Sequence, residues 1–329
     1  MRLRTVSSQE PGWRRIRRGR GFSYVDADGR PLAEDQVARV RDLVIPPAWA
    51  DVWICPYPRG HLQAVGTDDA GRRQYLYHPS WREQRDLEKF DRVTRLAHRL
   101  PGLRRKLRNQ LRAAPGEQDV ERRRILAAGV RLLDLGCFRP GSDESAEEFG
   151  SHGLTTLERR HVRRVQDTMV FEFVGKAGIE HEVVIEDADV VAALPWRRPV
   201  GARLLASKVG RRWQPVSADE LNEHIRAMTG LDVTAKDFRT WHATVTAAVT
   251  LAEQPLPGSV AGRRRRIREA VTAASELLGN TPTIARSSYV DPRVIDLFES
   301  GTVLDPGVKG PDALDRAVVR LLEGPSGNR

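Results

Sequence analysis

Hydrophobic and polar residues follow different patterns in the two parts of the chain. Up to about residue 80, apolar residues form short alternating runs separated by Gly, Pro and Asp clusters, which is typical of strands joined by turns. The runs at 13–16 and 22–25 flank a basic turn and predict a hairpin. Further strands are expected at 51–55, 61–65 and 72–77, with one short helix over 34–44. The sequence therefore predicts a small, β-rich N-terminal domain over residues 1–80.

After residue 80 the pattern is mainly that of helices. Apolar residues recur at spacings of three and four, which predicts helices over 80–100, 103–114, 121–135, 187–194, 218–228, 235–252, 259–278, 283–289, 292–299 and 311–322. Alternating runs at 161–166, 169–174 and 179–185 predict a small three-stranded sheet among them. We expect an α+β fold in which a larger, mainly α-helical domain over residues 81–329 follows the β-rich one.

The charge balance indicates what kind of molecule the protein binds. Lys and Arg number 54 against 44 acidic residues, a net charge of +10, and only six of the cations are lysines. An excess of this size favours a polyanionic partner, nucleic acid first. The alternative is that arginines simply cover solvated faces, as in proteins from GC-rich genomes. That bias explains why arginine outnumbers lysine, but it does not explain why basic residues outnumber acidic ones.

Several classes of protein and site are excluded. No run approaches the roughly 18 apolar residues of a membrane span, and the first ten residues lack the apolar segment of a signal peptide. Cys55 and Cys137 are too few for a disulfide framework or a cysteine zinc site, so we expect a reduced, cytoplasmic protein. There is no P-loop, no dinucleotide-binding glycine motif and no metal-ligand spacing among the histidines. Phosphate chemistry would then need cations and a side-chain nucleophile, with neither metal nor cofactor.

One tyrosine stands alone in the predicted helical domain. Four of the five tyrosines lie before residue 80, and the fifth, Tyr289, ends the segment Leu-Gly-Asn-Thr-Pro-Thr-Ile-Ala-Arg-Ser-Ser-Tyr. This segment resembles the active-site helix of the type IB DNA topoisomerases, in particular the poxvirus-like and bacterial group. The pattern of that family is roughly Gly-His-Thr-Pro followed by Ser-Lys/Arg-x-x-Tyr. The resemblance implies that Tyr289 is the nucleophile.

Three more segments resemble the same family and follow its order. Cys-Phe-Arg-Pro-Gly-Ser, which contains Arg139, is similar to the segment of the first catalytic arginine. Phe-Val-Gly-Lys, which ends at Lys176, is similar to the hairpin of the catalytic lysine. Lys-Asp-Phe-Arg-Thr-Trp, with Lys236 and Arg239, is similar to the motif of the second arginine, and Gly-Leu-Thr-Thr-Leu at 153–157 is also typical. The resemblance covers residues ~20–300, and the shared order makes it specific.

The chemistry of these residues agrees with the resemblance. Guanidinium groups stay protonated and present planar pairs of donors, so Arg139 and Arg239 can hold one phosphate from two sides. Lys176, at a predicted hairpin tip, can donate a proton to the departing 5′ oxygen, although a solvated turn lysine is the alternative. Lys236 shares a helix face with Arg239, and the alternative there is a surface basic pair with Asp237 as its counter-ion.

The chain departs from the family at Asn280, nine residues before Tyr289, where most members have histidine. An amide can donate a hydrogen bond to a phosphate oxygen but cannot carry charge or exchange a proton. We therefore expect a neutral donor at this position. The alternative is that Asn280 caps the helix that begins near Pro282.

In the N-terminal domain, the strand with Gln74, Tyr75 and Tyr77 looks like the DNA-contacting strand of the family. On a strand, Tyr75 and Tyr77 face the same way and Gln74 faces the opposite way. One face can then pack while the other reaches DNA, where a Gln amide can pair with adenine in the major groove. A plain hairpin aromatic is the alternative for Tyr75.

The resemblance implies a type IB DNA topoisomerase that relaxes supercoiled duplex DNA without ATP or metal. Tyr289 would form a 3′-phosphotyrosyl link, the broken strand would swivel, and the 5′ hydroxyl would religate it. We expect a cytoplasmic, nucleoid-associated monomer whose two domains form a clamp around DNA. The nearest alternative is a tyrosine recombinase or integrase, although those typically show His-x-x-Arg where this chain has Lys236. A non-catalytic, Arg-rich DNA-binding protein is the alternative from a different class.

Overall fold

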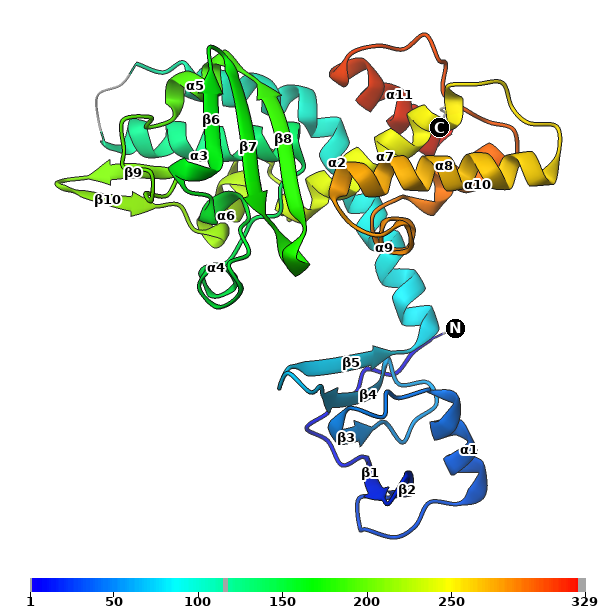
Figure 1. Cartoon of the computed structure of the whole chain (residues 1–329). Coiled ribbons are helices and arrows are strands. Elements are labelled where there is room, and N and C mark those ends of the chain that lie inside the picture. Colours follow the sequence, from blue (N-terminus) through cyan, green and yellow to red (C-terminus); the bar gives the residue numbers. More distant parts are fainter. Residues whose placement is uncertain (1, 115–117, 325–329) are drawn as a thin grey trace. The chain divides into compact units, whose positions relative to one another are not determined.

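The chain divides into two compact units, Met1–Lys89 and Phe90–Arg329. The structure is a computed structural model that describes residues 2–114 and 118–324. Within these described residues, no helix combines the length and the apolar character that crossing a membrane requires. The predicted fold class, a β-rich N-terminal part and a larger helical part with a small sheet, is confirmed (Figure 1). The boundary between the units falls at Lys89, whereas the sequence indicated residue 80.

The N-terminal unit is built on one antiparallel five-stranded sheet, in the order β2-β1-β3-β4-β5. The side chains of Trp13, Val52, Ile54 and Ala64 on one face of this sheet pack with Val40 of α1. Turn residues explain the register, since the Asp68 carboxylate accepts the backbone N–H groups of the β4–β5 turn. The elements are β1 (Trp13–Arg18), β2 (Gly21–Val25), α1 (Glu34–Asp42), β3 (Ala50–Ile54), β4 (Leu62–Thr67) and β5 (Arg73–Tyr77).

The second unit is mainly helical, with an antiparallel sheet in the order β6-β7-β8 and a separate hairpin, β9–β10. Its long helices α7 and α8 lie side by side, and α3 contacts α7, β8 and the hairpin (Figure 1). The helices are α2 (Pro79–Leu111), α3 (Gln118–Gly136), α4 (Asp143–Phe149), α5 (Ala188–Ala193), α6 (Ala218–Thr229), α7 (Ala235–Ala252), α8 (Val260–Leu278), α9 (Pro282–Ser288), α10 (Pro292–Glu299) and α11 (Pro311–Glu323). The strands are β6 (Val162–Val165), β7 (Thr168–Val174), β8 (Glu180–Glu186), β9 (Ala206–Val209) and β10 (Arg212–Pro215).

The sequence prediction of two helices at 80–100 and 103–114 is wrong, because α2 continues through Pro101. Leu100, Leu103 and Leu107 are buried on one side of this helix, so its apolar stripe does not stop at the proline. The burial of that stripe offsets the hydrogen bond that proline cannot make. The short α4 and the β9–β10 hairpin were not predicted, since α4 has no buried residue and both hairpin strands have only four residues.

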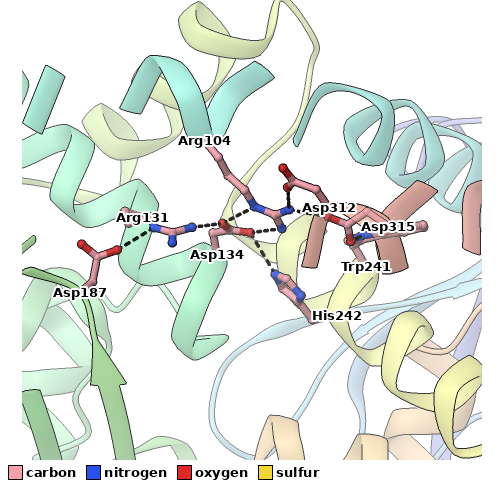
Figure 2. A network of polar contacts seen from close by, with 8 residues as sticks. All are labelled: Arg104, Arg131, Asp134, Asp187, Trp241, His242, Asp312 and Asp315. Atoms are coloured by element: carbon pink, nitrogen blue, oxygen red, sulfur yellow. Dashed lines mark hydrogen bonds and ion pairs between the residues drawn. The ribbon is translucent and has the colours of Figure 1, made fainter. Parts of the chain in front are cut away.

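A buried network of charges joins four helices of the second unit (Figure 2). Asp134 of α3 accepts hydrogen bonds from Arg104 of α2 and Arg131 of α3, and lies 3.4 Å from His242 of α7. Burial raises the pKa of Asp134, but its contacts with His242 and Arg104 outweigh this and hold the pKa well below its usual range. Arg104 also binds Asp315 of α11. The network fixes α3 against α7, and these two helices position the site described next.

Candidate active site

A small cavity, about 30 Å³, lies where the end of α3, the β7–β8 turn, α7 and the end of α8 meet. Three residues predicted from separate motifs line it: Arg139, Lys176 and Arg239. His152 and His181, which the sequence did not single out, line it as well. A volume of this size accommodates a polar group or two rather than a whole nucleotide. The cavity is therefore suited to one phosphate of a larger ligand.

Arg239, in the first half of α7, is buried, with 3% of its surface exposed. Its guanidinium donates to the carbonyl of Cys137 after α3 and, at 2.8 Å, to the carbonyl of Leu278 at the end of α8. Its Nε has no hydrogen-bond partner among the described residues. Burial and the nearby Arg139 lower the pKa of Arg239. An anion placed between the two arginines would relieve this cost.

Arg139 follows α3 in an irregular segment that lies between two residues with positive φ. Cys137 has a positive φ of 51°, which is uncommon for a residue other than glycine, and Gly141 has a φ of 95°. The carbonyl of Arg139 accepts the backbone N–H of Leu154 at 2.8 Å. A Cβ at Gly153 would lie 2.8 Å from that carbonyl oxygen, so the close approach requires glycine. The Gly-Leu-Thr-Thr-Leu segment thus supports the backbone that carries Arg139.

Lys176 lies in the turn between β7 and β8, as the sequence predicted. The turn closes with a hydrogen bond of 2.7 Å from the N–H of Gly175 to the carbonyl of Ile179. Ala177 and Gly178 both have positive φ, 65° and 73°. The Lys176 side chain is exposed and, within the described part of the chain, has no hydrogen bond or ion pair. Its amine is free to meet a ligand in the cavity.

Tyr289 ends α9, and its half-buried ring packs against the core of the second unit. The guanidinium carbon of Arg239 lies 5.5 Å from the centre of this ring. The carbonyl of Tyr289 accepts the hydroxyl of Thr244 at 3.2 Å, and its N–H donates to Ala285 at 3.0 Å. Helix α7 therefore supplies both the arginine beside the ring and the hydroxyl that holds the tyrosine backbone.

Asn280 links α8 to α9, and both polar atoms of its amide are buried without a hydrogen-bond partner among the described residues. The interpretation of Asn280 as a helix cap is wrong. Thr281 is the N-cap of α9, and its hydroxyl accepts the N–H of Ile284 at 3.3 Å. The Asn280 backbone completes the C-terminal turn of α8 instead, after Gly279 with a φ of 57°.

Lys236 is exposed at the start of α7 and is not part of the cavity wall, although Arg239 lies one turn further on. Asp237 is not its counter-ion. That carboxylate accepts the guanidinium of Arg92 at 3.0 Å and the backbone N–H of Thr234 at 2.8 Å. The suggestion of a local surface pair between Lys236 and Asp237 is therefore wrong.

In the N-terminal unit, β5 separates its side chains as expected. Tyr75 is 48% exposed, and its ring stacks on that of Tyr77 with 6.2 Å between centres. Gln74 donates its amide to the Asp68 carboxylate at 2.8 Å. The exposed Tyr75 thus stacks on a half-buried Tyr77 that packs against the core, and the amide of Gln74 hydrogen-bonds within the β4–β5 turn.

His181 is, with His152, one of two cavity histidines that sequence analysis missed. It lies on β8 opposite Phe173 of β7, in line with Val183 and the buried Ile185. Alternation along β8 points these three residues to the same face. A histidine on the apolar face of a strand was the available signal, and it has no characteristic motif around it.

Comparison with known proteins agrees with this geometry. The family model "Bacterial DNA topoisomerase IB, N-terminal domain" matches residues 21–68, within the N-terminal unit. DNA topoisomerase 1B of Acanthamoeba polyphaga mimivirus is 24% identical over 319 residues, which cover 92% of this chain and 91% of the viral protein. DNA topoisomerase I of Monkeypox virus is 21% identical over 246 residues, 73% of this chain and 74% of the viral one. DNA topoisomerase 1 beta of Arabidopsis thaliana is 24% identical over 210 residues, 63% of this chain but 22% of the plant protein.

The match that decides the family lies in the second unit and in α2. The family model "Eukaryotic DNA topoisomerase I, catalytic core" matches residues 78–297. This range includes Arg139, Lys176, Arg239 and Tyr289, and it is more than half of the chain. The chain therefore belongs to the type IB family of DNA topoisomerases.

Proposed function

We propose that this protein is a type IB DNA topoisomerase that relaxes supercoiled duplex DNA through a 3′-phosphotyrosyl intermediate on Tyr289. The observation that carries the proposal is the position of the Tyr289 ring beside Arg239, at a cavity that Arg139 and Lys176 also line. A nucleophile, two guanidiniums and a free amine are the groups that transfer of a phosphodiester to a side chain requires.

Unsatisfied polar atoms at the cavity and in the link that follows α8 support a bound anion. Arg239 Nε and both amide atoms of Asn280 are buried and lack partners within the described residues. Buried polar atoms without a partner cost free energy, so they are kept where a ligand satisfies them. In the proposed complex the two arginines bind the non-bridging oxygens of one phosphate, and Asn280 donates a neutral hydrogen bond to it.

The proposed reaction exchanges one phosphodiester for another. The hydroxyl oxygen of Tyr289 attacks phosphorus and loses its proton to water, while the bond from phosphorus to the 5′ oxygen breaks. Lys176 gives the departing 5′ oxygen a proton. The bond energy is kept in the phosphotyrosine, and the free 5′ hydroxyl reverses the step after the strand has swivelled. We place Lys236 at the same phosphate as a supporting cation, because it lies one helical turn from Arg239.

For the N-terminal unit we propose contact with the same duplex through β5. The exposed Tyr75, stacked on Tyr77, offers apolar and hydrogen-bonding contacts, and Gln74 would have to leave Asp68 to reach a base. We further propose that the enzyme acts as a monomer and lies with the nucleoid in the cytoplasm, where duplex DNA is its substrate. Tyr75→Ala should weaken duplex binding, whereas Val44→Ala, at a residue that is 80% exposed, should not.

Relaxation of supercoiled plasmid in the presence of a chelator tests the proposed function. The wild-type protein should relax the plasmid and, on denaturing gels, yield a covalent protein–DNA adduct. Tyr289→Phe should lose both while duplex affinity stays close to that of the wild type, because only the nucleophilic oxygen is removed. Tyr24→Phe, in the N-terminal unit, is the matched control and should relax DNA normally.

An adduct formed by Tyr289→Phe would overturn the assignment. Strand exchange at specific sites would favour a recombinase, and binding alone would favour a non-catalytic protein.

A further inference from the structure

His181 lies between the two segments that carry Lys176 and Asn280. Its ring stacks on Phe173, with 5.1 Å between centres and 17° between planes. A Cβ at Gly175 would lie 2.6 Å from the ring, and a Cβ at Gly279 would lie 2.3 Å from it. Both positions must therefore be glycine for the imidazole to fit. Gly175 and Gly279 directly precede Lys176 and Asn280, so the ring sets the spacing between the turn and the α8–α9 junction.

One ring nitrogen of His181 has no partner in the part of the chain that the structure describes. Nε2 of His181 is buried and makes no hydrogen bond to any described residue. The ring lines the same cavity as Arg139, Lys176 and Arg239. An imidazole kept for packing alone would be replaced at lower cost by an apolar ring, because burying an unpaired polar nitrogen is unfavourable. Its position among cations indicates that the missing partner is an anion.

The charges around His181 favour its neutral form in the free protein. Burial, then Arg139 and Arg239, lower the pKa of His181. Glu180 and Glu182 are its neighbours on β8 but point to the other face of the strand. The titratable and charged groups that line the hollows around the ring are Arg139, His152, Arg160, His161, Glu172, Lys176, Glu180, Glu182 and Arg239. On the cavity side these groups are cations and one further imidazole.

We propose that His181 is an additional phosphate-binding residue of the active site, which hydrogen-bonds a non-bridging oxygen of the scissile phosphodiester. This inference rests on the proposed function, since it takes the cavity as the phosphate site. The bound phosphate offsets the charge of Arg139 and Arg239, so the imidazole gains proton affinity when DNA binds. Packing of the same ring against Gly175 and Gly279 keeps the Lys176 turn next to the segment that carries Asn280.

Two substitutions separate the hydrogen bond from the packing. His181→Phe keeps a ring to stack on Phe173 but removes both nitrogens, and His181→Gln keeps a donor without the ring. Single-turnover cleavage by His181→Phe should slow about tenfold to a hundredfold, as expected for one lost hydrogen bond to a transition-state oxygen. His181→Gln should recover part of that loss. His98→Phe, at an exposed histidine of α2, should cleave at the wild-type rate. Normal cleavage by His181→Phe would show that the ring is only a spacer and overturn the proposal.

A titration without cleavage provides the second measurement. Imidazole resonances are followed by NMR against pH in Tyr289→Phe protein, free and bound to a duplex oligonucleotide, and the His181 signal is assigned by its loss in the His181→Phe double variant. The pKa of His181 should rise on binding. An unchanged pKa would overturn the phosphate contact. This readout does not depend on which residue is the nucleophile, so failure of the proposed function would be seen separately, as an adduct formed by Tyr289→Phe.

Discussion

Trp241 of α7 donates its indole N–H to the Asp315 carboxylate of α11, over a distance of 2.7 Å (Figure 2). Both residues are buried, and Asp315 also accepts Arg104 at 2.6 Å. Helix α11 lies beyond residues 78–297, the range that matches the catalytic-core family model. Trp241 is two residues from Arg239 on the same helix. Helix α11, which lies outside the matched core, thus completes a buried network that holds Trp241 in place, two residues after Arg239 on α7.

Asp315→Ala should therefore destabilise the protein strongly. The substitution leaves the Trp241 N–H and part of the Arg104 guanidinium buried without a partner, and breaking a buried charged pair typically costs about 3–5 kcal/mol. Asp312→Ala is the matched control, because Asp312 binds the same arginine but its side chain is 47% exposed. Urea denaturation followed by circular dichroism should show a much smaller loss for the control. Equal losses would mean that the burial of Asp315 is not what makes it important.

Lys176→Ala tests the role of the turn lysine. Removing a general acid should slow cleavage of an ordinary phosphodiester by about 10²–10⁴-fold. A substrate with sulfur in place of the 5′ bridging oxygen should be affected far less, because a thiolate leaves without a proton. Rates are measured for both substrates, with Lys236→Ala in parallel. Equal slowing of the two substrates by Lys176→Ala would assign this lysine to phosphate binding rather than to proton donation.

His161 predicts how stability depends on pH. Its Nδ1 accepts the backbone N–H of Glu158 at 3.0 Å, and the ring of His152 lies 4.3 Å away. Burial, followed by the neighbouring His152 and Arg160, lowers the pKa of His161 to about 4. The unfolded chain binds a proton near pH 6.5 and the folded one only near pH 4. The contribution of this residue is thus complete above pH 6.5 and is lost as the pH falls towards 4.

The measurement is the midpoint of urea unfolding between pH 7 and pH 4, for the wild type and for His161→Gln. The variant should lose less stability across this interval, because it has no imidazole to protonate. A His161→Gln curve parallel to that of the wild type would contradict the pKa assignment.

Sequence patterns predicted the elements well where their periodicity was strong. The bounds expected for the helices at 235–252 and 292–299 are those observed, because both have clear capping residues and a continuous apolar stripe. The break expected at Pro101 was wrong. The rule that proline ends a helix considers only local sequence, whereas the leucines on both sides of Pro101 are buried against one core. Four-residue strands such as those of β9–β10 carry too few residues to establish an alternation.

In the candidate site, residues that lie in a motif were predicted, and a residue marked only by tertiary contacts was missed. Arg139, Lys176, Arg239 and Tyr289 were found because each lies in a recognisable motif, and the cavity brings the first three together. His181 was missed because what marks it is tertiary: contacts with Gly279, far along the chain, and a ring nitrogen without a partner. For Asn280, only the structure showed that the N-cap of α9 is the next residue, Thr281.

Asn280→Ala and Thr281→Ala should have opposite consequences although the residues are adjacent. The Asn280 amide is buried and has no partner among the described residues, so its removal should leave the melting temperature unchanged or raise it slightly. If it donates one hydrogen bond to the transition state, the cleavage rate should fall roughly tenfold to a hundredfold, equivalent to about 1–3 kcal/mol. Thr281→Ala removes the hydroxyl that caps α9, which costs about 1 kcal/mol and lowers the melting temperature by about 2–4 °C.

Asn280→His should stay active and acquire a pH dependence near the titration range of imidazole. Normal cleavage by Asn280→Ala would remove this residue from the catalytic set, and the unsatisfied amide would then need another ligand to explain it.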